Sequence, residues 1–219
     1  MRHRLMITAA GLVASAVLSS GCLVKESHHT LALEPDGSVR WLALDRDIHA
    51  VADTAAARLR EETDFMARVA NERHPTAVGL LALGAVGVKT QVVSADWPFV
   101  VTTEARFDNI AELWQRFFAL TGMKGSNTLT RDGNRTTWTL VVDTKEETVG
   151  TASDDERKGI ESLLDGDEGP VLVIRQGRFV ESVGFDIADD GRVATLDDLS
   201  ERDWDKEPRL VLSLTWIRE

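Results

Sequence analysis

The sequence predicts an α+β fold: a largely antiparallel sheet built from hairpins, crossed by one long and one shorter amphipathic helix. Strand-like runs come in pairs separated by turn residues, which is typical of hairpins. Helical stretches interrupt them without the regular alternation that indicates a parallel sheet. The 219 residues are 43% apolar and 28% charged, which is enough to bury a core of ordinary size.

The first elements form a predicted hairpin. Residues 30–34 alternate apolar and other side chains, and residues 39–44 form a second strand-like run. Pro35-Asp36-Gly37-Ser38 joins them with strong turn chemistry, because proline fixes φ and glycine allows positive φ.

A long amphipathic helix is expected over residues 45–73, where apolar side chains recur at helical spacing. His74-Pro75 ends it, and its apolar stripe predicts packing against the sheet. Residues 77–88 follow as a short buried helix leading into a strand. Residues 89–93 and 99–107 then form another strand pair around Asp96-Trp97-Pro98.

The second, shorter helix spans residues 109–121, with Asn109 and Glu112 spaced as a capping box. Asp132-Gly133-Asn134 predicts a hairpin between residues 127–130 and 135–142.

A linker-like stretch follows at 150–169. It contains a short helix with a capping box at Ser153, and further strands are expected at 171–174, 179–187 and 210–217. The body, residues 29–219, is one domain or two lobes divided near 150–169.

The amino terminus has the pattern of a secretory signal. Arg2 and Arg4 precede an uncharged, mostly apolar run at residues 5–18, and Ser19-Ser20-Gly21 follows. Fourteen residues at about 1.5 Å each are too short to span a bilayer. Residues 1–21 are therefore interpreted as a removable leader.

The chain's single cysteine stands at the end of this leader, in Leu18-Ser19-Ser20-Gly21-Cys22. This segment resembles the lipobox of bacterial lipoprotein precursors, although the leucine stands one position early and Ser19 occupies its usual place. The resemblance implies that the signal is cut before Cys22 and that the cysteine sulfur receives a diacylglycerol. Residues 22–28 would then be a short tether. The alternative is an ordinary signal peptide followed by a free thiol.

The same resemblance implies residence in the outer membrane or the cell membrane, with the body facing the periplasm or the exterior. Leu23 is not the aspartate that favours inner-membrane retention in bacteria with two membranes. The opening hairpin pattern, residues 29–44, weakly resembles the LppM-like group of envelope lipoproteins, which implies a lipid-carrying body.

Charge is unevenly distributed. The chain has a net charge of −11, and residues 143–168 and 186–207 carry −7 and −6. This acidity argues against nucleic-acid binding. The candidate oxygen ligands for a divalent cation are Asp165, Asp167, Glu168, Asp189 and Asp190. Their spacing is not that of an EF-hand, and Asp-Gly pairs are common turn residues. We therefore expect a solvated acidic face, with no metal and no cofactor.

Six tryptophans occur without a tyrosine. Trp41, Trp138 and Trp216 lie in strand runs, where they either fill the core or line a cleft for a lipid or a sugar.

Three function classes follow. The first is a non-enzymatic envelope lipoprotein, held by the membrane through Cys22, that binds or assembles with an envelope protein. The second is a module that binds or carries a hydrophobic ligand such as a lipid. The third is an enzyme based on scattered carboxylates, which is the weakest because the sequence has no Gly-x-Ser-x-Gly, phosphate-binding or dinucleotide motif. An apolar cavity would favour the second class.

Overall fold

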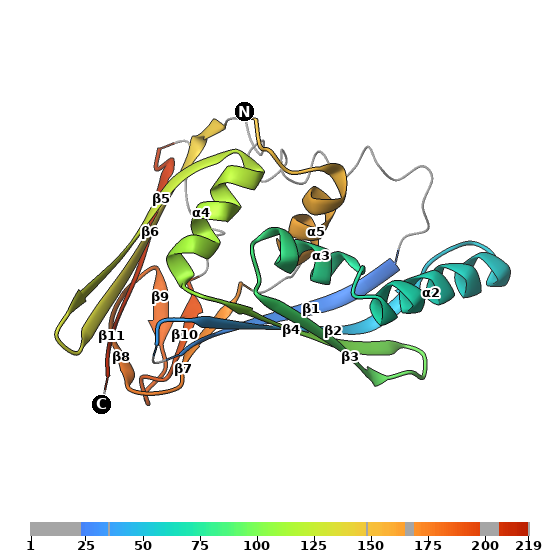
Figure 1. Ribbon diagram of the computed structural model, residues 1–219, viewed down its shortest axis with the longest axis horizontal. Helices are drawn as coiled ribbons and strands as arrows, with labels where there is room; N and C mark the ends of the chain where they lie inside the picture. Colours follow the sequence, from blue (N-terminus) through green and yellow to red (C-terminus); the bar gives the residue numbers. More distant parts are fainter. Residues whose placement is uncertain (1–22, 35, 148, 165–168, 198–205, 219) are drawn as a thin grey trace.

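Two sheets and four helices make up the described part of the computed structural model, which covers residues 23–34, 36–147, 149–164, 169–197 and 206–218 (Figure 1). The strands are β1 Leu23–Leu33, β2 Val39–Ala50, β3 Gly87–Ser94, β4 Phe99–Phe107, β5 Met123–Asp132, β6 Arg135–Glu147, β7 Val171–Ile174, β8 Arg178–Val183, β9 Phe185–Ile187, β10 Val193–Leu196 and β11 Arg209–Ile217. The helices are α2 Ala55–Ala70, α3 Pro75–Ala82, α4 Ile110–Thr121 and α5 Asp154–Leu164. The predicted α+β class is confirmed.

The larger sheet has the order β3-β4-β2-β1-β7-β10-β9, and the smaller sheet has the order β5-β6-β11-β8. Every pairing is antiparallel except β1 with β7, in which Leu31 lies beside Leu172. Both sheets draw strands from either side of residues 150–169, so a division of the chain there does not separate them.

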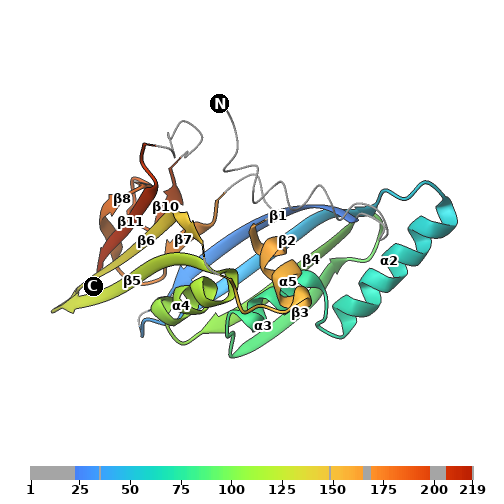
Figure 2. The ribbon, with the colours of Figure 1, turned by 90° about the horizontal axis from the view of Figure 1, so that it is seen from above.

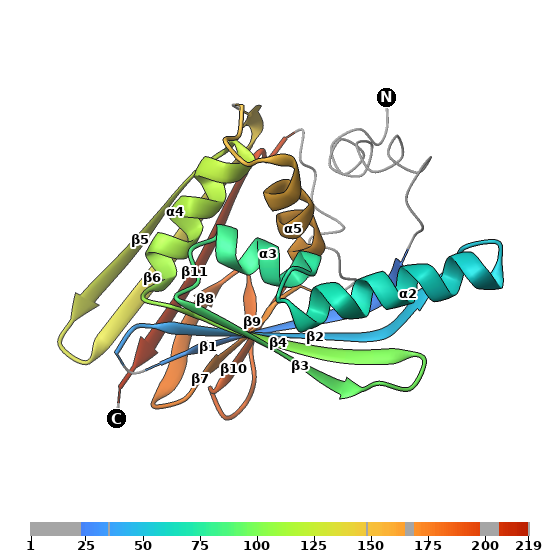
Figure 3. The same ribbon diagram turned by 45° about the vertical axis from the view of Figure 1, so that its right-hand side comes forward.

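The helices α3, α4 and α5 lie on one face of the larger sheet, and α4 fills the angle between the two sheets (Figures 1 and 3). Seen from above, α2 extends at the opposite end of the larger sheet from the smaller sheet (Figure 2). One continuous apolar core joins both sheets with α3, α4 and α5, and a small separate cluster lies under α2. No helix of the described residues is both long and apolar enough to cross a bilayer.

The predicted hairpins are confirmed. Leu33 pairs with Val39 across the first turn, and Asp132 pairs with Arg135 around Gly133. Asn109 caps α4 by accepting a hydrogen bond from the Glu112 backbone N–H at 2.8 Å, as the capping pattern predicts.

Three sequence predictions need correction. The helix expected over 45–73 begins only at Ala55, because β2 continues to Ala50. The tether expected over 22–28 is instead strand from Leu23 onward, since β1 pairs with β2 from Leu23 to Leu33 with a register shift between Val24 and Glu26. The strand expected over 179–187 is two strands in different sheets, separated by Gly184 at a φ of 74°. A side chain at Gly184 would overlap Leu212, so glycine suits both the backbone angle and the close approach.

Candidate functional site

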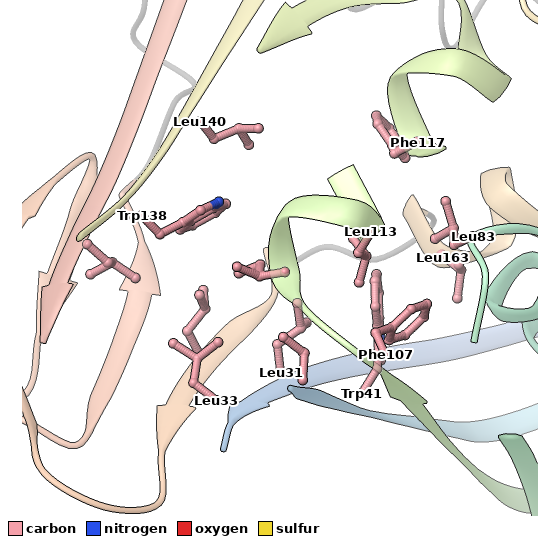
Figure 4. Close-up of a cluster of buried hydrophobic side chains, with 14 of the residues drawn as sticks. Leu31, Leu33, Trp41, Leu83, Phe107, Leu113, Phe117, Trp138, Leu140 and Leu163 are labelled. Carbon is pink, nitrogen blue, oxygen red and sulfur yellow. The ribbon is translucent and has the colours of Figure 1, made fainter. Parts of the chain in front are cut away.

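A cavity of about 220 Å³ lies where the two sheets meet α4 and α5. All of its described lining residues are apolar. From the strands they are Leu31, Trp41, Trp138, Leu172, Phe185, Leu196 and Leu212, and from the helices and their flanks Leu83, Leu113, Trp114, Phe117, Ile160, Leu163, Leu164 and Pro170. Figure 4 shows this part of the core, with Trp138 on β6, Leu31 on β1 and Leu113 on α4.

Local sequence places the α4 wall. Leu113, Trp114 and Phe117 share one side of the helix because residues three and four apart lie on one face. Asn109 fixes where the helix begins, and Gly122, at a φ of 76°, ends it. The helix caps set the length of this wall, and the helical spacing sets which side chains belong to it.

The α5 wall is set by a close helix crossing. The Ser153 backbone N–H donates to the Glu156 carboxylate at 2.8 Å, and Ser153 Oγ accepts from the Glu156 backbone N–H at 3.4 Å, as expected for a capping box. Gly79 of α3 and Gly159 of α5 touch so closely that a Cβ on either would overlap the other's backbone. This contact places Ile160 and Leu163 over the cavity.

The most exposed part of the described lining lies at the carboxyl end of α5. Leu164 lines the cavity there and is 60% exposed, and Pro170 and Leu196 beside it are half-buried. A concave hollow lined mainly by apolar side chains is the usual form of a small-molecule site.

Two of the three tryptophans singled out in the sequence line this cavity. Trp41 and Trp138 are part of its wall, whereas Trp216 is buried elsewhere, against Phe179 at a ring distance of 6.5 Å. Trp114, which lies in the helix predicted over residues 109–121, also lines the cavity and stacks on Trp138 with ring centroids 6.2 Å apart. Its helical position predicts an inward side chain, but only the fold brings it to Trp138.

The three indole N–H groups of the cavity differ. Trp41 Nε1 donates to His29 Nδ1 at 3.1 Å. The Nε1 atoms of Trp114 and Trp138 are buried and have no hydrogen-bond partner within the described part of the chain. A buried donor without an acceptor costs about 1–3 kcal/mol of stability.

A buried polar cluster lies on the same face of the larger sheet but does not line the cavity. Lys25 Nζ lies 2.8 Å from Asp45 Oδ1 and 2.9 Å from Ser162 Oγ. Ser27 and Thr76 also donate to the Asp45 carboxylate, at 2.7 and 2.8 Å. These contacts connect β1, β2, α3 and α5. The Lys25 ammonium that contacts Ser162 also forms the ion pair with Asp45.

The cluster and its histidines have shifted acidities. Burial alone raises the pKa of the Asp45 carboxyl, but the Lys25 ammonium and the hydrogen bonds from Lys25, Ser27 and Thr76 outweigh it and hold that pKa below its usual value. Burial lowers the pKa of His29 and of His74 to about 4, and the Lys25 charge adds to this while Asp45 opposes it.

The metal candidates do not come together in the part that the structure describes. Asp190 accepts a hydrogen bond from the Arg192 backbone N–H at 2.8 Å, and the Gly191 N–H donates to the Ala188 carbonyl, so Asp189 and Asp190 belong to a tight turn. Among the described residues, no three His, Cys, Asp or Glu side chains are placed to share an ion. Asp165, Asp167, Glu168 and the anchor candidate Cys22 lie outside those residues.

No protein-family model matches the sequence, and no curated protein matches it either. Among solved structures, the chain is similar to the folded domain of Mycobacterium tuberculosis LppM, with a TM-score of 0.38 and 10% identity over 92% of this chain and 94% of that one. It is also similar to the Danio rerio Fcho1 mu homology domain with a bound Eps15 peptide, with a TM-score of 0.26 and 8% identity over 91% of this chain and 79% of that one. These likenesses are weak, and function has to be inferred from the cavity itself.

Proposed function

We propose that this protein binds one small apolar molecule, or one short apolar chain of a larger lipid, in the cavity between its two sheets. The observation that carries this proposal is the wholly apolar described lining with an exposed leucine at its rim. The binding module for a hydrophobic ligand, one of the function classes expected from the sequence, thereby takes precedence over a purely assembling lipoprotein.

The size of the cavity limits the ligand. At about 220 Å³ it exceeds the roughly 150 Å³ engineered cavity that takes up benzene, and it is smaller than the roughly 300–1,000 Å³ of pockets for drug-sized molecules. One short acyl segment fits this range better than a whole membrane lipid.

The proposal includes the membrane anchor and the absence of catalysis. The lipobox-like segment ending at Cys22 supports a diacylglycerol anchor and residence in the cell envelope, with the body facing away from the cytoplasm. Two or three acyl chains hold a protein stably, whereas one is marginal. A wall of apolar side chains can bind an apolar ligand and exclude water. The role that we propose is non-enzymatic.

Filling the cavity tests the binding proposal. Leu196→Trp adds a large side chain at the half-buried rim, and it should weaken binding of the neutral fluorophore N-phenyl-1-naphthylamine by about tenfold or more. Leu42→Trp is the matched control, because Leu42 is 42% exposed and lies outside the lining. Equal binding by both variants and the original protein would place the fluorophore elsewhere and contradict the proposal.

A further inference from the structure

Exposed apolar side chains gather at one end of the larger sheet. They are Val24 of β1, Val51 just after β2, Val93 of β3 and Trp97 in the turn between β3 and β4, with exposed fractions from 43% for Val24 to 60% for Val93 and Trp97. The end of β2 pairs with the starts of β1 and β4, and the start of β4 also pairs with the end of β3. All four side chains therefore lie at the end of the sheet where β1 begins (Figure 1).

A ring contact and the strand alternation place part of this group on one face. Val24 pairs with His49, and the His49 ring lies against the Trp97 ring with centroids 6.0 Å apart. Lys25, the next residue after Val24, contacts Ser162 of α5. Because successive side chains of a strand alternate, Val24 points to the face opposite the helices. We call these residues, together with Val51 and Val93, the end patch.

The end patch adjoins the proposed lipid anchor. β1 begins at Leu23, directly after Cys22, which is the residue proposed to carry the diacylglycerol. An extended residue spans at most about 3.6 Å, so the backbone of Val24 stays within about 7 Å of that of Cys22. With the lipid in the bilayer, this end of the sheet is held at the membrane surface.

The chemistry of the end patch suits the zone of lipid head groups. Tryptophan is enriched at membrane–water interfaces, because its ring is apolar and its N–H remains hydrated. The charges that border the patch are not predominantly basic: Arg46 pairs with Glu26 at 2.7 Å, and Asp47 and Asp96 are acidic. Burial of apolar surface is therefore the main attraction to lipid here, ahead of attraction to anionic head groups.

We propose that the end patch docks the folded body directly on the lipid bilayer, with Trp97 and Val93 among the head groups. This inference rests on the anchor in the proposed function and adds the orientation of the body. The smaller sheet lies at the opposite end of the larger sheet from α2, so docking in this way holds the smaller sheet away from the membrane (Figure 2).

An environment-sensitive probe on one added cysteine tests the docking. Cys22 is the only cysteine of the chain, and its sulfur is blocked once acylated, so a nitrobenzoxadiazole label on Val93→Cys in the full lipidated chain reports one site. Val183→Cys on β8 of the smaller sheet is the matched control, because Val183 is 55% exposed. In phosphatidylcholine vesicles, the emission of the Val93→Cys label should shift to shorter wavelength, and that of the Val183→Cys label should not.

The outcomes separate the docking from the anchor. Protein that floats with the vesicles but gives the same emission from both labels would overturn the inference and leave the anchor intact. A shift that appears only as the protein-to-lipid ratio rises would assign the end patch to contact between copies, which also overturns it. Protein that does not float with the vesicles would remove the anchor and the inference together.

A second measurement uses the native side chain. Brominated phosphatidylcholine should quench part of the tryptophan emission of the original protein, and Trp97→Phe should lose most of that quenching. Trp216→Phe is the control, because Trp216 is buried in the core and should leave the quenching in place. Quenching that is the same in both variants would contradict the docking of Trp97 on lipid.

Discussion

Asp45 on β2 is the residue where the polar contacts of the fold converge. Lys25 and Ser27 of β1 and Thr76 of α3 all donate to its carboxylate, and Lys25 continues to Ser162 of α5. Its side chain is 2% exposed, so the carboxylate depends on these partners and not on water.

Asp45→Asn should therefore be strongly destabilising. It leaves the buried Lys25 ammonium without its counter-charge, which typically costs about 3–5 kcal/mol of the free energy of unfolding. Chemical denaturation measures this. Glu26→Gln is the matched control: it breaks the Glu26–Arg46 pair, both of whose side chains are more than half exposed, and should change stability by less than about 1 kcal/mol. Similar losses in the two variants would show that the cluster is not a structural centre.

The buried histidines predict how stability depends on pH. The pKa values of His29 and His74 are lowered from 6.5 to about 4, so between these values the unfolded chain binds more protons than the folded one. Stability should be complete above pH 6.5 and should fall by a few kcal/mol as the pH drops towards 4. Protonating His29 also removes the acceptor that Trp41 Nε1 uses.

Denaturation curves recorded across this pH range test the assignment. His74→Gln removes one of the two groups and should make the decline shallower. A decline of the same size in that variant would mean that other groups control the pH dependence.

At the scale of the elements, the crossing of α3 and α5 holds the cavity wall. Gly159→Ala would normally favour a helix by about 1 kcal/mol. Here the added Cβ would overlap the backbone of Gly79, so we expect destabilisation of about 1–3 kcal/mol. Gly87→Ala on β3 is the control, because its Cβ would meet nothing within 4 Å. Thermal or chemical denaturation that ranks the two variants equally would contradict this packing.

Local signals predicted the hairpins and α4 because their causes are local. The turn at Asp36-Gly37 and the Asn109 cap each act within four residues, and the structure contains both. The sequence pattern favours helix over the second half of β2 because a bulge interrupts the strand alternation. The register shifts between Asp45 and Ile48, and Asp47 has a φ of 51°. The alternation of a strand is lost there, and the apolar residues of this segment also fit the spacing of a helix.

The cavity itself was not predictable from local patterns. Trp114 and Trp138 are in different elements, and their stacking depends on how α4 packs into the angle between the sheets. The parallel pairing of β1 with β7 joins residues some 140 positions apart and has no turn to mark it. The polar cluster likewise joins Lys25 to Ser162, which no spacing rule connects.

For the whole molecule, the start of β1 at Leu23 has a geometric consequence if Cys22 carries the lipid. The tether is then almost absent, and the end of the larger sheet where Leu23 pairs with Ala50 lies against the bilayer. Leu31, in the cavity wall, is eight residues further along the strand, or about 26 Å at 3.3 Å per residue.

The anchor has its own test. Cys22→Ser should move the protein from the membrane fraction to the soluble fraction, because the thiolate that accepts diacylglycerol is gone. Ser20→Ala keeps a small residue in the same segment and should leave the protein on membranes. A Cys22→Ser variant that still sediments with membranes would contradict lipid anchoring.

The most direct test of the central claim is native mass spectrometry of the full chain, extracted from its envelope in a mild detergent that is removed in the gas phase. The cavity predicts one additional bound apolar molecule beyond the covalent mass of the chain, and its absence from Leu196→Trp prepared in the same way. A bare covalent mass for the original protein, or the same additional molecule retained by Leu196→Trp, would contradict the assignment of the cavity as the binding site.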